Sequence, residues 1–403
     1  MTITLISQVL ALVGLALLGM LLTRLTRLEL TLSCMLIGFL AGLGIGYVDF
    51  DTGIRAHNLQ DLVFFVILPV LIFEAAWHIK PALLGRWLVP VMVLATLGVL
   101  ISCLIGAGLV YVGIGHPTGF PWMAALLTGA ILAATDPISV IDQLRKLDAP
   151  EDLTTLFEGE SLFNDATAVV LFTLFLGLAM MEPESSEMTY LGFFAMVFFG
   201  GLLVGIVCGL VSAAIALYLA NPAATVLVLV FSAFGSFFLA EHLFHVSGIM
   251  AVVATAVITR WALSDAEERL AGGVGVTWDW LGLFFNSILF VIMGLVITVD
   301  MFKERWLAML IAIGAALVAR AAAVGLCSLA TSPLKHSIGF GWQLLLFWGG
   351  LRGAIAIALV LALPVELDYW YTIQSMVFGV VLFSMLVQGT TNSFLVKRFG
   401  NPL

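Results

Sequence analysis

Charged residues are scarce in this sequence. Asp, Glu, Lys and Arg together make up 10% of the 403 residues, whereas 62% are hydrophobic, and the mean hydropathy is +1.16. A soluble globular domain does not have this balance, so the composition predicts a protein embedded in a lipid bilayer. The formal net charge of −9 gives no reason to expect a nucleic-acid partner.

Cysteines are also few, and they are isolated from one another. Cys34, Cys103, Cys208 and Cys327 each lie within an apolar run, a spacing that suits neither a zinc site nor a disulfide framework. The polar motifs described below contain no nucleophile paired with a base. The sequence therefore predicts no cofactor and no enzyme activity.

What the sequence does contain is a series of apolar runs long enough to cross a bilayer, about thirteen in all. They fall near 3–23, 31–47, 59–78, 87–113, 121–144, 152–181, 190–219, 222–240, 246–262, 279–299, 306–330, 341–363 and 371–396. Strict alternation of apolar and polar residues, typical of lipid-facing barrel strands, is absent. The predicted fold is an all-α polytopic membrane protein whose backbone bonds close within helices.

Basic residues divide unevenly between the two sets of loops that thirteen spans create. Because lysine and arginine favour cytoplasmic loops, we expect a multi-pass protein of the cell inner membrane with its N-terminus outside and its C-terminus cytoplasmic. The inner loops would hold Arg24, Arg27, Lys80, Arg86, Arg145, Lys146, Arg260, Arg269, Lys335, Lys397 and Arg398, and the outer loops Arg55, Lys303 and Arg305.

The stretch FEGESLFNDATAVVLF, residues 157–172, carries acids inside an apolar helix-length run. On a helix, Ser161, Asn164 and Asp165 all fall within about 140° of Glu160, so the four form one polar stripe. An ionisable side chain in the membrane is costly and marks a functional site. The stacked oxygens would suit a hard monovalent cation. The alternative is a polar network that only holds helices together.

A second polar motif, GAILAATDPISV at 129–140, contains a proline in the middle of a predicted span. Pro137 lacks an amide donor and disfavours helical geometry at Asp136, so the helix should break here. Transporters use such breaks to present backbone groups to ions. Thr135 and Asp136 would then face an ion. The alternative is a proline kink with a solvated aspartate.

A third motif, GGLRGA at 349–354, interrupts a span in the second half of the chain. Two interrupted spans in corresponding positions indicate two inverted six-helix repeats, with spans one to six matching spans eight to thirteen. Asp136 in one break and Arg352 in the other could offset the partial charges of the half-helix ends where the breaks cross.

Two further charged residues lie inside predicted spans. Arg320 needs a buried partner, and Glu160 is the candidate. Glu74 lies one turn before His78 near the inner end of its span, where it could help bind an ion through water or simply reach the interface. His78, His242 and His245 could sense protons, although interfacial histidines are the simpler interpretation.

In combination, these motifs resemble the monovalent cation/proton antiporters of the NhaP-like sodium/proton exchanger branch. The resemblance rests on ATDP at 134–137, EGESLFND at 158–165, VAR at 318–320 and GGLRGA at 349–354. It implies that Asp165, Asp136, Thr135 and Ser161 bind Na⁺. Asn164 would support that site, Glu74 would help through water, and Glu160 would pair with Arg320.

The resemblance also implies a division of labour within one membrane domain and a homodimer. Residues 1–85 and 222–300 would form a dimerisation scaffold, residues 86–181 and 304–396 an ion-transporting core, and residues 190–219 the linking helix. The core would move like an elevator, with no cofactor beyond the transported Na⁺ and H⁺. The short C-terminus is typical of a compact prokaryotic exchanger.

The predicted function is exchange of Na⁺, with Li⁺ or K⁺ as alternatives, for H⁺. A proton and a cation compete for Asp165, and one titrating carboxylate favours electroneutral one-for-one exchange. A K⁺/H⁺ antiporter of the same mechanism stays open. A cation channel would need its carboxylates along a continuous pore, and an intramembrane aspartyl protease would need Asp136 and Asp165 to share one water.

Overall fold

The computed structural model describes residues 2–26, 28–45, 62–114, 120–180, 190–264, 274–333 and 337–400, and every regular element in these ranges is a helix. Nine of the described helices are long and apolar enough to cross a membrane. Three shorter apolar helices cover residues 30–44, 63–78 and 248–262. The all-helical prediction is confirmed, while the count of thirteen crossings stays a prediction.

The helices of the first half coincide with the first six predicted runs. They are α1 (Thr2–Thr26), α2 (Leu30–Ile45), η1 (Val63–Ile67), α4 (Leu68–His78), α5 (Pro81–Val93), η2 (Leu94–Gly98), α6 (Val99–Gly113), α7 (Trp122–Ala133), α8 (Ile138–Lys146) and α9 (Glu151–Ala179). The single helix α10 (Tyr190–Leu219) follows.

The helices of the second half coincide with the remaining six runs. They are α11 (Pro222–Phe238), η3 (Leu239–Leu243), α12 (Gly248–Ala262), α14 (Val274–Val296), α15 (Val299–Thr331), α16 (Phe340–Trp348), α17 (Ala354–Leu361), α18 (Trp370–Phe383), η5 (Ser384–Gly389) and α19 (Thr390–Phe399).

Several helix boundaries differ from the predicted ones because hydropathy does not register a polar helix end. The helix α14 begins at Val274, so Asp279 lies inside a helix and not at its start. The helix α15 begins at Val299, which places Lys303 and Arg305 in its first turns and not in a loop. Of the other basic residues assigned to loops, Arg27, Arg55, Arg269 and Lys335 lie outside the described residues.

The two predicted interruptions are breaks in the helices. After α7 ends at Ala133, the chain is non-helical until α8 begins at Ile138, directly after Pro137. After α16 ends at Trp348, a glycine-rich segment leads to α17 at Ala354. The first break follows from the missing amide and rigid ring of proline, and the second from the low helix propensity of glycine.

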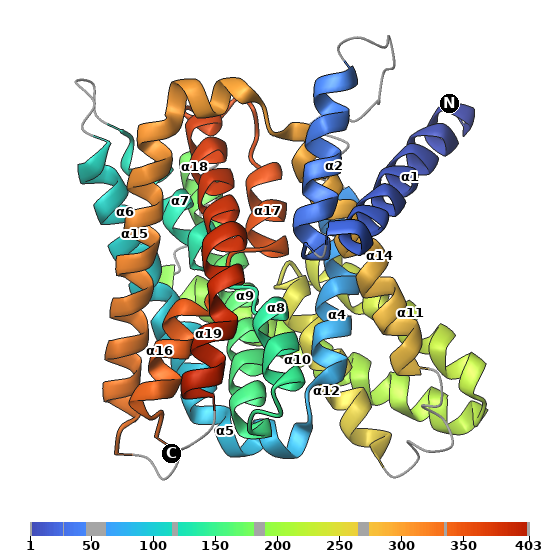
Figure 1. The fold of residues 1–403 in the computed structure, drawn as a ribbon. Coiled ribbons are helices and arrows are strands. Elements are labelled where there is room, and N and C mark those ends of the chain that lie inside the picture. Colours follow the sequence, from blue (N-terminus) through green and yellow to red (C-terminus); the bar gives the residue numbers. More distant parts are fainter. Residues whose placement is uncertain are drawn as a thin grey trace.

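Helices far apart in the sequence pack side by side in two groups (Figure 1). In one group α15 lies against α6 and α18, with α16 and α19 beside them. In the other, α14 packs on α2 and α4, and α10 packs on α12. The helix α7 packs on α6 and α18 of the first group, and α9 contacts α7 as well as α4 and α12 of the second group. The polar face of α9 therefore lies where the two groups meet.

Candidate functional site

The two helix breaks lie against each other. The amide of Asp136 donates to the carbonyl of Leu351 over 2.8 Å, so the two non-helical segments share a backbone hydrogen bond. The Asp136 carboxylate accepts from the amide of Ala354 at 3.1 Å and from that of Ile138 at 3.2 Å. Those amides begin α17 and α8, so the negative charge lies at the positive ends of two helices.

A buried arginine completes the other side of the crossing. One guanidinium nitrogen of Arg352 donates to the carbonyls of Ala133 at 3.0 Å and Ala134 at 2.8 Å. These carbonyls end α7, where the partial charge is negative. The amide of Arg352 donates to the hydroxyl of Ser384 in η5 at 3.2 Å. These contacts satisfy, within protein, backbone groups that the two breaks release, as a membrane requires.

The glycines beside Arg352 allow two close approaches. A Cβ atom at Gly353 would overlap the carboxylate of Asp136, and one at Gly350 would lie 2.6 Å from Nε of Arg320. Neither neighbour is the free end of a flexible chain, because both side chains are held by hydrogen bonds. The GGLRGA motif therefore brings its backbone against two charged groups.

The buried face of α9 carries an ion pair. Arg320 of α15 donates from both terminal nitrogens to the two carboxylate oxygens of Glu160, at 2.8 and 2.9 Å. The same guanidinium donates to the carbonyl of Leu346 near the end of α16. Glu160 is 1% exposed and Arg320 is 6% exposed. A buried bidentate ion pair of this kind fixes α9, α15 and α16 relative to one another.

A short hydrogen-bonded chain links this pair to the first helix break. The side-chain nitrogen of Asn164 donates to Glu160 at 2.8 Å and to the hydroxyl of Thr135 at 2.6 Å. The hydroxyl of Ser161 donates to the carbonyl of Thr135 at 2.8 Å. The extended segment before Pro137 is therefore held against α9 by two polar side chains.

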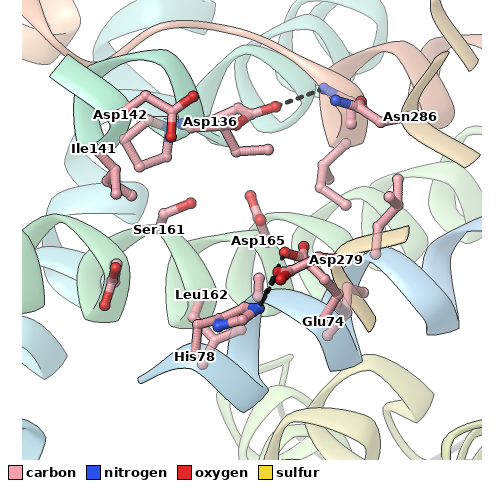
Figure 2. A pocket seen from close by; sticks show the side chains of 18 of the residues that line it. Glu74, His78, Asp136, Ile141, Asp142, Ser161, Leu162, Asp165, Asp279 and Asn286 are labelled. Carbon is pink, nitrogen blue, oxygen red and sulfur yellow. Dashed lines mark hydrogen bonds and ion pairs between the residues drawn. The ribbon is translucent and has the colours of Figure 1, made fainter. Parts of the chain in front are cut away.

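A cavity of about 240 Å³ lies beside the first helix break and α9, which form one wall of it. Among the described residues, six carboxylates line it, together with one arginine and one histidine, and this excess of acids would raise the local concentration of cations. The charged and polar lining residues are Glu74, His78, Asp136, Asp142, Arg145, Glu158, Ser161, Asp165, Asp279 and Asn286. In Figure 2, Asp165 points into the space between Asp136 and Glu74.

The carboxylate of Asp165 differs from the other carboxylates that line the cavity. Its oxygen Oδ1 is buried and has no hydrogen-bond partner among the described residues. A buried carboxylate oxygen without a donor is costly, unless a cation or a proton fills the place. The oxygens of Asp136 and Ser161 line the same cavity, so the arrangement offers oxygen ligands to a hard cation.

The structure brings together four of the six residues that the sequence assigns to ion binding. Glu74, Asp136, Ser161 and Asp165 all line the cavity. Two others, Thr135 and Asn164, lie behind its wall, where they are almost completely buried and bonded to each other. Glu160, Arg320 and Arg352 do not line it, and their contacts are those of the helix crossing and the ion pair.

Some lining residues were missed from the sequence. Asp279 and Asn286 lie on α14, and Asp142 lies on α8. An amide in the middle of an apolar run and an aspartate between two tryptophans were available signals. The pair of Arg145 and Glu158, 2.7 Å apart at the edge of the cavity, could not be predicted, because it depends on how α8 folds back on α9.

Comparison with known proteins agrees with this architecture. The family model described as "Sodium/hydrogen exchanger, transmembrane" matches residues 12–398. The chain belongs to the sodium/hydrogen exchanger family. The match includes both helix breaks, α9 and every described residue that lines the cavity.

Two curated relatives align with most of this chain. The chain is 38% identical over 372 residues to the Na⁺/H⁺ antiporter ApNhaP of Aphanothece halophytica, a match covering 90% of this chain and 68% of the relative. It is 34% identical over 367 residues to the Na⁺/H⁺ antiporter NhaH of Halobacillus aidingensis, a match covering 86% of this chain and 85% of the relative.

A solved structure has the same fold. The sodium proton antiporter MjNhaP1 from Methanocaldococcus jannaschii superposes with a TM-score of 0.82 at 22% identity, covering 98% of this chain and 99% of that one. This likeness confirms the predicted antiporter fold, in which inverted repeats cross at their broken helices.

Proposed function

We propose that this protein is a secondary active antiporter that exchanges Na⁺ for H⁺ at a single site centred on Asp165. The observation that carries the proposal is the unpartnered, buried oxygen of Asp165 at the end of an acidic cavity. The family and the curated Na⁺/H⁺ antiporters among its relatives support the choice of ions.

Coupling follows from competition for one carboxylate. A bound cation needs Asp165 ionised, with Asp136 and Ser161 as further oxygen ligands and Glu74 acting through water. A proton on Asp165 removes the negative charge that attracts the cation. Because the two occupants exclude each other, each crossing of the site carries one or the other.

The residues behind the cavity hold this site in place. In this proposal Glu160 stays ionised against Arg320, so it does not exchange protons with the transported ion. Thr135 and Asn164 fix the extended segment that carries Asp136, and Thr135 contributes its backbone and hydroxyl oxygens when the segment adjusts to the ion. Arg352 compensates the end of α7.

The stoichiometry that this arrangement favours is one cation for one proton. The residue before Asp165 is an amide, and its nitrogen is committed to Glu160 and Thr135. With no acid at position 164 and with Glu160 paired to Arg320, the proposal assigns the exchanged proton to Asp165, so that exchange would move no net charge.

Transport requires the site to open alternately to the two sides of the membrane. We propose that residues 86–181 and 304–396 form a core that moves against a scaffold of residues 1–85 and 222–300, connected by the helix 190–219. The cavity supports this division, because Asp165 and Asp136 face Glu74 and Asp279 across it. An elevator-like shift of the core against the scaffold would carry the bound ion across the membrane.

The proposed placement is a cell inner membrane, with the N-terminus outside, the C-terminus in the cytoplasm and a homodimeric assembly. The side chain of Arg145 is 54% exposed and that of Asp279 is 61% exposed, which marks the mouth of the cavity. Arg145 belongs to the basic set that favours the cytoplasm, so this conformation would be open to the inside.

Flux into proteoliposomes tests the function. With a pH dye inside, a Na⁺ gradient should drive proton movement in the wild type, and Asp165→Asn should abolish it, because the amide can neither release a proton nor supply a negative charge. Asp142→Asn, which removes another acid from the same cavity, is the matched control and should keep most of the flux. Sodium-driven flux of wild-type size in Asp165→Asn would refute the assignment.

The same vesicles distinguish the proposed function from two alternatives, a K⁺/H⁺ antiporter and a cation channel. Titration with Na⁺, Li⁺ and K⁺ in parallel identifies a K⁺/H⁺ antiporter, which the same oxygens could support. A voltage clamp set with K⁺ and valinomycin identifies a cation channel, because a channel current follows the voltage. An electroneutral exchanger would give the same Na⁺-driven pH change at every voltage.

A further inference from the structure

Three potential metal ligands meet at the mouth of the cavity, apart from the oxygens of Asp136 and Asp165. Glu74 and His78 lie one turn apart on α4, and Asp279 extends from α14 (Figure 2). The His78 nitrogen Nε2 lies 2.8 Å from an Asp279 oxygen and 3.6 Å from a Glu74 oxygen. One ligand atom from each residue lies within 4.8 Å of the other two.

The packing of α4 on α14 holds these side chains in position. Phe73 stacks on Trp278 with ring centroids 4.2 Å apart, and both rings are buried. Each ring precedes one of the ligands in the sequence, so the stack fixes the backbone on both sides. A Cβ atom at Gly282, one turn after Asp279, would lie 2.9 Å from the side chain of Glu74. The glycine therefore leaves the room that the Glu74 carboxylate occupies.

The ligand set indicates a transition-metal ion. One imidazole and two carboxylates suit Zn²⁺, which takes four ligands at about 2.0–2.2 Å. Ligands around such an ion lie about 3.3 Å apart, so the observed separations require only side-chain rotations. Ca²⁺ and Mg²⁺ prefer shells made of oxygen alone. The site can be reached from solvent through the side chain of Asp279, which is 61% exposed, while the Nε2 atom of His78 is buried behind it.

We propose that Glu74, His78 and Asp279 bind Zn²⁺, or a divalent transition-metal ion of similar size, and that the bound ion blocks the cavity. Water would fill the fourth position. The ion would stand between the opening and Asp165 and would engage Glu74, so it would close the route that a transported cation takes. All three ligands come from α4 and α14, which pack on each other, so the site would persist while other helices move.

Binding to purified protein tests the site without relying on transport. Isothermal titration with Zn²⁺ should detect one tight site in the wild type, and Mg²⁺ should give none. Loss of an outer-shell partner already costs about tenfold or more in metal affinity, so removal of a ligand in His78→Gln or Asp279→Asn should weaken Zn²⁺ binding at least as much. Thermal unfolding of each variant checks that the fold is intact, and the exposure of Asp279 makes Asp279→Asn the safer of the two.

Two control variants separate this site from other sources of Zn²⁺ binding. Asp142→Asn removes a carboxylate from the same cavity but outside the three ligands. His242→Gln removes a histidine that stacks on Phe65 elsewhere. Both should keep wild-type Zn²⁺ affinity. If Asp142→Asn weakens binding as much as Asp279→Asn, or if both ligand variants bind like the wild type, the site is refuted.

The blocking effect rests on the proposed function and needs a flux measurement. Zn²⁺ on the side where the cavity opens should inhibit Na⁺-driven proton flux in the wild type and much less in Asp279→Asn. Tight binding with undiminished flux would overturn the block. If the wild type shows no flux even without Zn²⁺, the proposed function fails, and the binding titration still decides the site.

Discussion

Asp136 and Arg352 each bind a helix end that lies next to the other residue's helix break. Asp136 belongs to the first break and accepts hydrogen bonds from the amide that begins α17, next to the second break. Arg352 belongs to the second break and donates to the carbonyls that end α7, next to the first. Each charge thus stabilises a helix end that the other break created. An acid and a base placed in this way fit a crossing of two inverted repeats.

Loss of the arginine should weaken the crossing. Arg352→Gln leaves the carbonyls of Ala133 and Ala134 without their charged donor in a buried place. We expect the free energy of unfolding to fall by about 3 kcal/mol, since hydrogen bonds to charged groups contribute about 1.5–3 kcal/mol each. Thermal unfolding in detergent measures the loss. The exposed Arg24 provides the control Arg24→Gln, and equal melting of the two variants would contradict the role of Arg352.

A methyl group at Gly353 should damage both the crossing and the ion site. In Gly353→Ala the new Cβ would overlap the carboxylate of Asp136, which has to move away from the amide of Ala354. We expect reduced stability and weaker Na⁺ binding, measured by unfolding and by isothermal titration. The control is Gly325→Ala in α15, where a Cβ meets open space. It should stabilise its helix by about 0.5–1 kcal/mol. Indistinguishable Na⁺ affinity in Gly353→Ala and the wild type would contradict the prediction.

The pair of Glu160 and Arg320 should be strongly coupled. Arg320→Ala leaves a buried carboxylate without its cation, a change that costs about 3–5 kcal/mol. Glu160→Gln leaves the arginine with the carbonyl of Leu346, so we expect a smaller loss. The double variant should lose clearly less than the sum of the single losses, because no unpaired charge remains. Additive losses in unfolding experiments would show that the two side chains act independently.

The sequence predicted the parts of the fold that local chemistry controls. Pro137 and the glycines around Arg352 break their helices wherever they lie, so both interruptions could be predicted. Spacing along α9 placed Glu160 and Asn164 on one face, because the helical repeat is fixed.

What the sequence did not predict depends on how separate helices pack. Asp279 faces Glu74 and His78 only because α14 lies against α4, and hydropathy had placed it at the edge of a span. Thr135 and Asn164 carry the residue types of an ion site, yet they bond to each other behind the cavity wall. Tertiary contacts decide whether a buried polar side chain faces the cavity, and a single sequence gives no information on these contacts.

Asn164→Asp tests why an amide precedes Asp165. The amide nitrogen donates to Glu160 and to Thr135, and an ionised aspartate cannot donate to either. A protonated aspartate can still donate one hydrogen bond, so the variant should lose one of the two bonds at every pH and the other only where the new acid loses its proton. Since two ionised carboxylates at hydrogen-bonding distance repel, its melting temperature should fall further below that of the wild type as the pH rises. Melting curves at mildly acidic and alkaline pH measure this, with the nearby Asp142→Asn as a control that gains no buried acid.

The Asn164→Asp variant should still exchange one Na⁺ for one H⁺ where it is folded, because its added proton is retained. A melting difference independent of pH would mean that the amide does not act as a donor to Glu160 and Thr135.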